Sequence, residues 1–247
     1  LIFEELVAHQ VSLLSRRAYI QQIEAPRISA SRQFAKQLLS SLPFEMTNAQ
    51  KRVSKEIVQD LKLNKPMLRL VQGDVGAGKT LVAGVAACHV LEEGWQVALM
   101  APTEILAEQH YLNFKKWFEP LGLSVSWLSG KQKGKARAAA EQAIVDGTAH
   151  LVVGTHALFQ DNVRFAKLGL VIIDEQHRFG VDQRLALRNK GAQNMTPHQL
   201  VMTATPIPRT LAMSTYGDLD TSVIDELPPG RTPIQTVTIP LDRREEV

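Results

Sequence analysis

The sequence predicts a doubly wound α/β domain, because apolar strand-like runs alternate with helical stretches from Met67 onward. The runs are rich in Val, Ile and Leu, and a glycine-rich turn joins the first run to the first helical stretch. Strands that read as continuous apolar runs are covered by helices on both faces. Alternation of strands with helices implies parallel pairing through right-handed crossovers, which is the doubly wound arrangement.

The individual elements follow from the same pattern. Strands are expected at residues 67–73, 96–101, 124–129, 150–154, 168–174 and 198–204. Helices are expected at residues 79–93, 103–118 and 135–146. Residues 1–42 are expected to form a helical N-terminal extension, because their leucines recur at helical spacing. The stretch LPPGRTP ends the compact pattern after about Asp225, and IQTVTIP beyond it is a further strand candidate.

Composition limits the class of protein. The 247 residues are 45% apolar and 21% charged, which is typical of a globular protein with a full hydrophobic core. The longest apolar runs are shorter than the roughly 18 to 20 residues of a membrane span, and the acidic N-terminal stretch does not resemble a secretion signal. The single cysteine, Cys88, excludes an internal disulfide and is expected to be a buried small apolar residue. We therefore expect a cytoplasmic protein without a membrane partner.

The net charge of +3 permits binding to a polyanion without requiring it. One short segment, GKQKGKAR, concentrates Lys131, Lys133, Lys135 and Arg137. It has two interpretations: a solvated loop that leads into a helix, or a contact with nucleic acid.

The glycine-rich turn has the pattern of a phosphate-binding loop. GDVGAGKT at residues 73–80 matches GxxxxGK[ST], with a strand before it and a helix after it. Glycines let backbone N–H groups converge on phosphate oxygens, and the positive end of the following helix adds to the field. Lys79 would bring a positive charge to the β and γ phosphates of ATP, and the Thr80 hydroxyl would bind Mg²⁺. The expected loop residues are Gly73, Asp74, Val75, Gly76, Ala77, Gly78, Lys79 and Thr80.

An acidic pair follows a second buried strand. In LVIIDEQH, at residues 170–177, the apolar run carries Asp174 and Glu175 to the carboxyl end of the strand, where ligands bind in open α/β sheets. Asp174 would hold Mg²⁺, and Glu175 would orient and polarise the attacking water as a general base. A solvated acidic pair is the alternative for this stretch taken alone, and the phosphate loop favours the catalytic interpretation.

The order of these motifs resembles a known superfamily. GDVGAGKT, APTEILAEQH, VGTHALF, VIIDEQH and TATPIPRT follow one another as in the first RecA-like motor lobe of superfamily 2 helicases, which are P-loop NTPases. With LPFEMTNAQ and LPPGRTPIQT, the wording is most similar to RecG-type branch-migration helicases, and the transcription-repair coupling translocase is the nearest sibling. The resemblance extends over the whole chain.

The resemblance implies an adenine-reading element in LPFEMTNAQ. Gln50 would offer a donor and an acceptor to the adenine edge, and Phe44 an aromatic face. Phe44 is equally well interpreted as a core residue.

Two further elements would contact the DNA backbone by the same resemblance. They comprise Pro102, Thr103 and Glu104 at the start of one helix, and Gly154, Thr155 and His156 at the end of one strand. As alternatives, Thr103 is a simple helix cap and His156 is a polar loop residue.

TATP at residues 203–206 resembles the element that links hydrolysis to lobe movement. Thr203 and Thr205 would bond to Gln176 or His177, so that loss of the γ-phosphate is felt at the DNA face. Arg209 has two interpretations of equal weight, a contact with DNA or with a carboxylate.

The resemblance also implies a domain organisation. Residues 1–42 would be a helical linker from an upstream DNA-binding module, and residues 43–225 the ATP-binding lobe. Residues 226–247 would lead to a second lobe, whose arginines complete the γ-phosphate site. Because such an arginine is worth roughly 10³ to 10⁵ in rate, this chain alone should hydrolyse ATP poorly.

The expected function is that of an ATP-dependent DNA helicase or translocase that remodels stalled forks and Holliday junctions in recombination and repair, at the bacterial nucleoid. One alternative is the transcription-repair coupling translocase, which moves on duplex DNA without separating its strands. An alternative from another class is a small-molecule P-loop kinase or a nucleotide-gated binding module. That class leaves TATP and GTHALF unexplained.

Overall fold

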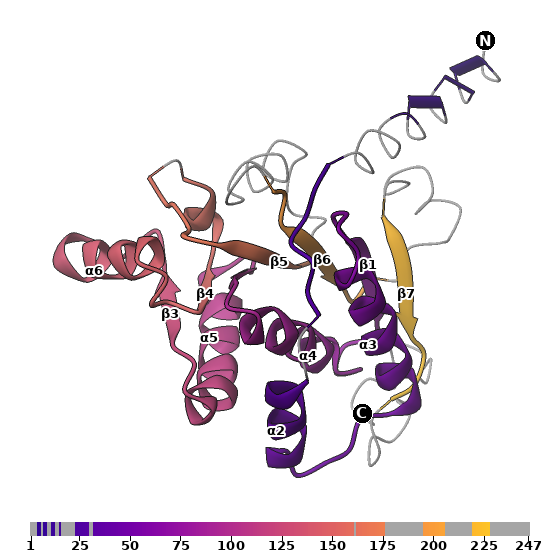
Figure 1. The fold of residues 1–247 in the computed structure, drawn as a ribbon, viewed down its shortest axis with the longest axis horizontal. Helices are drawn as coiled ribbons and strands as arrows, with labels where there is room; N and C mark the ends of the chain where they lie inside the picture. Colours follow the sequence, from indigo (N-terminus) through magenta and orange to yellow (C-terminus); the bar gives the residue numbers. More distant parts are fainter. Residues whose placement is uncertain are drawn as a thin grey trace, which may run out of the picture.

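The centre of the molecule is one parallel sheet. The computed structural model describes residues 4–5, 7–8, 11–12, 15, 23–29, 32–160, 162–175, 195–205 and 219–227. Seven strands form the sheet in the order β3-β4-β2-β5-β6-β1-β7, and all neighbours run parallel (Figure 1). The strands are β1 (Leu68–Gly73), β2 (Gln96–Met100), β3 (Val125–Leu128), β4 (Leu151–Gly154), β5 (Leu168–Asp174), β6 (His198–Thr203) and β7 (Asp220–Ile224).

The described helices either precede β1 or connect successive strands. They are α2 (Gln33–Ser41), α3 (Asn48–Leu61), α4 (Lys79–Glu92), α5 (Glu104–Phe118) and α6 (Gly134–Val145), with short 3-10 turns η1 (Glu119–Leu121) and η2 (His156–Phe159). Thr47 and Thr103 cap α3 and α5, because each side chain accepts a hydrogen bond from an N–H of the first turn. None of the helices in the described part of the chain is long and apolar enough to cross a membrane.

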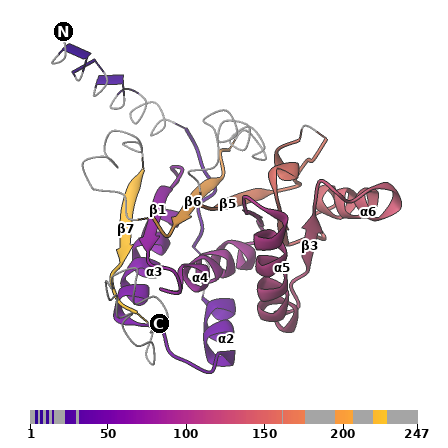
Figure 2. The same cartoon turned by 180° about the vertical axis from the view of Figure 1, so that it is seen from behind.

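Helices α2, α3, α4 and α5 pack against one face of the sheet, and α6 packs against the other face beside β3 (Figures 1 and 2). Leu99, Val153 and Ile172 pack into one core together with residues of α2, α3, α4 and α5. Their strand neighbours Val152 and Ile173 pack into a second core with Ile144 of α6. This alternation is the period of two expected of a pleated strand that is buried on both faces.

Helix α4 lies at the centre of the first core, and its burial is nearly complete. It contacts α2, α3 and the sheet, which explains why 11 of its 14 residues are buried. Cys88 lies on this helix with no exposed surface, as the sequence predicts, and burial raises the pKa of its thiol. A helix that is apolar all round is typical of such a position.

The predicted parallel sheet is confirmed, and the six expected strands lie close to their predicted bounds. Strand β7 is an addition that the sequence pattern does not reveal. Its sequence DTSVI is mostly polar and mostly exposed, because β7 is an edge strand with β1 as its partner. Residues 228–247, including the strand candidate IQTVTIP, lie outside the described residues.

The helical extension expected over residues 1–42 is interrupted. Residues 24–29 form a non-helical segment, which we call the N-terminal strap. Pro26 explains the break, because proline removes a backbone donor and disfavours helical geometry in the residue before it. Within the strap, Ala25 N donates to Asn64 O at 3.0 Å and Ile28 N donates to Leu61 O at 2.8 Å.

His198 joins the strap to the sheet. Its Nδ1 accepts a hydrogen bond from Met67 N at 3.0 Å, and its Nε2 donates to Pro26 O at 2.7 Å. The ring is completely buried. Burial lowers the pKa of His198 from 6.5 to about 4, so the ring is neutral in the folded protein at neutral pH.

This burial predicts acid sensitivity. Because the folded pKa of His198 lies below the unfolded value of 6.5, its contribution to stability is present above pH 6.5 and is lost as the pH falls toward about 4. The loss should approach about 3 kcal/mol of unfolding free energy. Urea unfolding across this pH range should show a shallower acid loss for His198→Gln, which does not titrate, than for the wild type. Equal slopes for the two proteins would contradict the assignment.

Candidate active site

Strand register brings the two sequence motifs to one edge of the sheet. Strand β6 lies between β1 and β5, with Gln72 opposite Thr203 and Asp174 opposite Met202. All three strands are parallel, so the phosphate loop, the acidic pair and the TATP turn all follow their carboxyl ends. Open parallel sheets bind ligands at this edge.

The loop between β1 and α4 bends through glycines. Gly76 and Gly78 have φ values of 79° and 84°, which side chains adopt only at a cost, and Ala77 N donates to Asp74 O at 3.0 Å. Gly78 is the N-cap of α4 and has no side chain to bond the first turn, which also contains no acidic residue. The first N–H groups of α4 are therefore suited to an anion.

Gln50 connects α3 to this loop. Its Nε2 donates to Ala77 O at 2.8 Å, while its Oε1 accepts from Thr47 N at 3.0 Å in a capping box. A Cβ at Gly78 would collide with Gln50 Nε2. Gly78 is therefore favoured by its left-handed backbone, and a Cβ there would also displace the Gln50 amide from its bond to Ala77 O.

Lys79 lies over the loop with its charge partly buried. Its Nζ donates to Gly73 O at 2.7 Å and to Asp74 O at 3.0 Å. Burial lowers the pKa of Lys79, and the charges of Asp174, Glu175 and Asp74 act in the opposite direction. The acidic pair thus lies within electrostatic range of the loop lysine.

Glu175 has an unusual backbone and a fixed carboxylate. Its φ is 52°, in the left-handed region, which costs a residue with a side chain about 1–3 kcal/mol. Glu175 N donates to Met202 O at 2.9 Å, and its carboxylate accepts from Ala204 N at 3.0 Å and from Thr203 Oγ1 at 3.3 Å. These bonds to the end of β6 hold the conformation.

Two residues that the sequence analysis did not single out complete the edge. Gln72, which precedes Gly73, donates from Nε2 to Thr205 O at 3.1 Å and so binds the TATP turn to the start of the phosphate loop. His110 of α5 lies with Nε2 2.7 Å from Asp174 Oδ2. The sequence offers one indication of a role for His110. It is a polar residue at a position of α5 whose buried neighbours on the same face, Ala107 and Phe114, are apolar.

The TATP turn contacts the acidic pair directly. The expected partners of Thr203 and Thr205, Gln176 and His177, lie outside the described residues, as does Arg209. Among the described residues, Thr203 bonds the Glu175 carboxylate, and its Oγ1 also accepts from Thr205 N at 3.1 Å.

The residues expected to contact DNA differ in exposure. Pro102 and Thr103 are partly exposed, and Thr103 Oγ1 accepts from Leu106 N at 3.3 Å as the cap of α5. The Glu104 carboxylate accepts from Ser129 Oγ at 2.6 Å, so it is already paired within the domain.

In the second element only one residue reaches the surface. Gly154 and Thr155 are buried, and His156 is exposed. A Cβ at Gly154 would collide with the Leu128 carbonyl, so this glycine is required by the close approach of β3.

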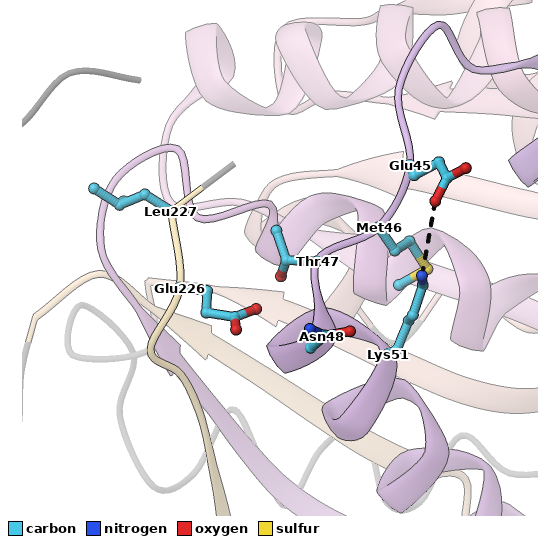
Figure 3. A pocket seen from close by; sticks show the side chains of 7 residues that line it. All are labelled: Glu45, Met46, Thr47, Asn48, Lys51, Glu226 and Leu227. Carbon is cyan, nitrogen blue, oxygen red and sulfur yellow. Dashed lines mark ion pairs between the residues drawn. The ribbon is translucent and has the colours of Figure 1, made fainter. Parts of the chain in front are cut away.

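Exposure also decides the interpretation of Phe44. The core interpretation is wrong, because Phe44 is 52% exposed. An open hollow of about 500 Å³ lies at the start of α3, where the residue after Phe44, Glu45, is part of its lining (Figure 3). Its lining comprises Glu45, Met46, Thr47, Asn48, Lys51, Glu226 and Leu227, without Phe44 or Gln50. Glu226 accepts from Ala49 N at 2.8 Å, which fixes the chain after β7 against this helix end.

The four basic residues of GKQKGKAR also differ in exposure and in their contacts. Arg137 donates to Glu141 at 2.8 Å and to Gln160 at 2.7 Å, so its charge is used within the domain. Lys131, Lys133 and Lys135 are exposed. Of the four basic residues in this segment, these three lysines are the ones exposed to a polyanion.

The donor set at the sheet edge fits Mg²⁺. Asp174 and Thr80 offer hard oxygen ligands next to the phosphate loop, and Mg²⁺ in nucleotide sites takes one or two such ligands plus phosphate oxygens. The described residues contain no group of three His, Cys, Asp or Glu side chains that would hold a metal by themselves. A metal bound jointly by protein and phosphate does not require one.

A parallel sheet with a phosphate loop after β1 and an acidic pair after β5 defines a RecA-like P-loop nucleotide-binding domain. The chain belongs to the DEAD/DEAH box helicase family, whose model matches residues 47–214.

Curated relatives and solved structures agree with this assignment. The ATP-dependent DNA helicase RecG of Escherichia coli K12 is 62% identical over 100% of this chain, and that of Aquifex aeolicus is 48% identical. The chain spans 36% and 31% of these two relatives. The structure of RecG bound to a three-way DNA junction superposes with a TM-score of 0.87 at 43% identity, over 99% of this chain and 32% of that one. The predicted resemblance to RecG-type helicases is confirmed.

The approach of Gln50 to Gly78 predicts a large effect of a single methyl group. Gly78→Ala should lower the free energy of unfolding by about 2–3 kcal/mol, because it adds a collision to the strain of a positive φ. Gly94→Ala is the matched control, since Gly94 has φ 76° and nothing within 4 Å of an added Cβ. Denaturant unfolding should show a loss of only about 1 kcal/mol for the control. Equal losses for the two variants would show that the Gln50 side chain moves aside without lowering the free energy of unfolding.

Proposed function

We propose that this chain is the ATP-binding motor lobe of an ATP-dependent DNA helicase or translocase that remodels branched DNA, such as stalled forks and Holliday junctions. The observation that carries the proposal is the convergence of the phosphate loop, the acidic pair and the TATP turn on one sheet edge, in a chain 62% identical to an ATP-dependent DNA helicase. A relative bound to a three-way DNA junction supports the choice of branched DNA. The bacterial relatives support a site of action at the bacterial nucleoid.

Recognition of the nucleotide would begin at the loop. Backbone N–H groups of residues 73–78 and of the first turn of α4 would bind phosphate oxygens, and Lys79 would exchange its carbonyl contacts for the β and γ phosphates. Gln50 is 3% exposed and already bonds Ala77 and Thr47. To bind the adenine edge with the N–H and lone pair that remain, its amide would have to become accessible. The exposed ring of Phe44 would offer a stacking face.

Hydrolysis would use the acidic pair. Thr80 and Asp174 would hold Mg²⁺, which when bound neutralises charge that develops on the phosphates. Glu175 would accept a proton from the attacking water, with its carboxylate oriented by Ala204 N–H and Thr203 Oγ1.

Coupling to DNA would run through the same bonds. A change at Glu175 alters a contact with Thr203, and Gln72, the residue before the loop, bonds Thr205. Among the residues expected at the DNA face, the partly exposed Pro102 and Thr103 and the exposed His156 could reach a phosphate. A second motor lobe would supply the arginines that complete the γ-phosphate site.

The two roles at the nucleotide site are separable by mutation. Lys79→Ala should weaken ATP binding by at least about tenfold, because it removes the loop cation. Glu175→Gln should leave binding nearly unchanged and reduce hydrolysis in the complete motor by about 10² to 10⁴. Fluorescence titration with an ATP analogue and a phosphate-release assay measure the two steps. Hydrolysis by Glu175→Gln at the wild-type rate would exclude Glu175 as the base.

The two-lobe requirement predicts a weak isolated lobe. The 247-residue chain should bind ATP but hydrolyse it slowly and without stimulation by DNA, because arginines in trans are worth roughly 10³ to 10⁵ in rate. A longer protein with both lobes should respond most strongly to forked DNA when single-stranded, duplex and forked DNA are compared. Rapid hydrolysis by the single lobe would refute the requirement, and equal stimulation by all three DNAs would refute the preference for branches.

A further inference from the structure

His110 of α5 contacts the carboxylate at the centre of the proposed hydrolysis site. Its Nε2 lies 2.7 Å from Asp174 Oδ2, and the two side chains are only 10% and 14% exposed. An ionised carboxylate can only accept hydrogen bonds, so Nε2 is the protonated nitrogen of this pair. The bond joins residues that are 64 positions apart in the sequence and lie on different elements of the fold.

Packing alone does not account for a histidine at this position. The other nitrogen, Nδ1, is buried and has no hydrogen-bond partner among the residues that the structure describes. An unpaired buried acceptor disfavours the folded state, and the neighbouring buried positions on α5 hold Ala107 and Phe114. An apolar residue would stabilise the core better. We therefore attribute the polar side chain at this position to its contact with Asp174.

The ring is held in one orientation. His110 and Phe114 meet edge to face, with ring centroids 6.4 Å apart and planes inclined by 64°. Phe114 is completely buried in the first core, where it stacks on Phe118. A fixed ring restricts the direction from which Nε2–H can reach Asp174.

We propose that His110 is a positioning residue for the Mg²⁺–nucleotide site. By bonding Oδ2 of Asp174, it would hold the carboxylate and leave Oδ1 as the oxygen that could bind Mg²⁺. Partners of this kind orient metal-binding carboxylates in other proteins, and their loss typically costs about 10- to 100-fold in metal affinity or activity. The inference rests on the proposed function, since it assigns to Asp174 the metal role described above.

The same bond would connect the site to the DNA face. Thr103 is the N-terminal cap of α5, and His110 lies seven residues further along the same helix. Seven residues of helix span about 10 Å. A shift of the helix start on a DNA phosphate would therefore move the donor that orients Asp174.

Nucleotide binding with and without Mg²⁺ tests the assignment. The affinity of the 247-residue chain for a fluorescent ATP analogue is compared in Mg²⁺ and in EDTA. His110→Leu should reduce the gain in affinity that Mg²⁺ provides by about tenfold and leave the affinity in EDTA unchanged. His110→Gln should retain most of the gain, because its Nε2–H can reach the same oxygen. Asn113→Ala, an exposed change on the same helix, is the control and should behave as the wild type.

The outcomes separate this inference from the proposed function. If Mg²⁺ raises the affinity of His110→Leu as much as that of the wild type, while circular dichroism shows both to be folded, the role of His110 is refuted and the nucleotide site stands. If Mg²⁺ has no effect on the wild type, the proposed function fails and the inference fails with it.

A second measurement does not depend on the folding of His110→Leu. Long-range ¹H–¹⁵N spectra of the wild-type chain report which ring nitrogen of His110 carries a proton. Protonation at Nε2 supports the bond to Asp174, and a ring protonated at Nδ1 alone refutes it.

Discussion

The position of β6 between β1 and β5 is the constraint on which the rest of the site depends. Its register sets Thr203 beside Gln72 and Met202 beside Asp174, and the parallel direction of the strands brings all three carboxyl ends to one edge. A shift by one residue would turn every side chain of β6 to the opposite face and separate Thr203 from Glu175. The buried residues Leu200 and Val201, which pack into opposite cores, hold the register against such a shift.

At this edge of the sheet, each key polar group is bonded to a residue of a neighbouring element. The Glu175 carboxylate bonds the end of β6, Thr205 is bonded by Gln72, and Asp174 is bonded by His110. The left-handed backbone at Glu175 is maintained because the Glu175 N–H and carboxylate are both used. Such an arrangement holds the proposed base and metal ligand through bonds within the protein itself, which is the preorganisation that electrostatic catalysis requires.

The sequence predicts the parts of the site that local patterns determine. The glycine spacing of residues 73–80 and the apolar runs before Gly73 and Asp174 specify a loop, two strands and their polar ends without knowledge of distant residues. The parts that it does not predict depend on long-range contacts. Strand β7 is recognisable only through its pairing with β1, and His110 only through a bond to a residue 64 positions away. The break before α2 follows from Pro26, but its place against the sheet follows from His198.

The N-terminal strap has a mechanical consequence. Its bonds to Asn64, Leu61 and His198 fasten the chain at the amino ends of β1 and β6, and the phosphate loop follows the carboxyl end of β1. Tension applied to residues before the strap would therefore be borne by the backbone at the base of the two central strands. Such a force would act at the amino ends of β1 and β6, whereas the phosphate loop lies at the carboxyl end of β1. The lobe would therefore transmit the force along these strands as a rigid body.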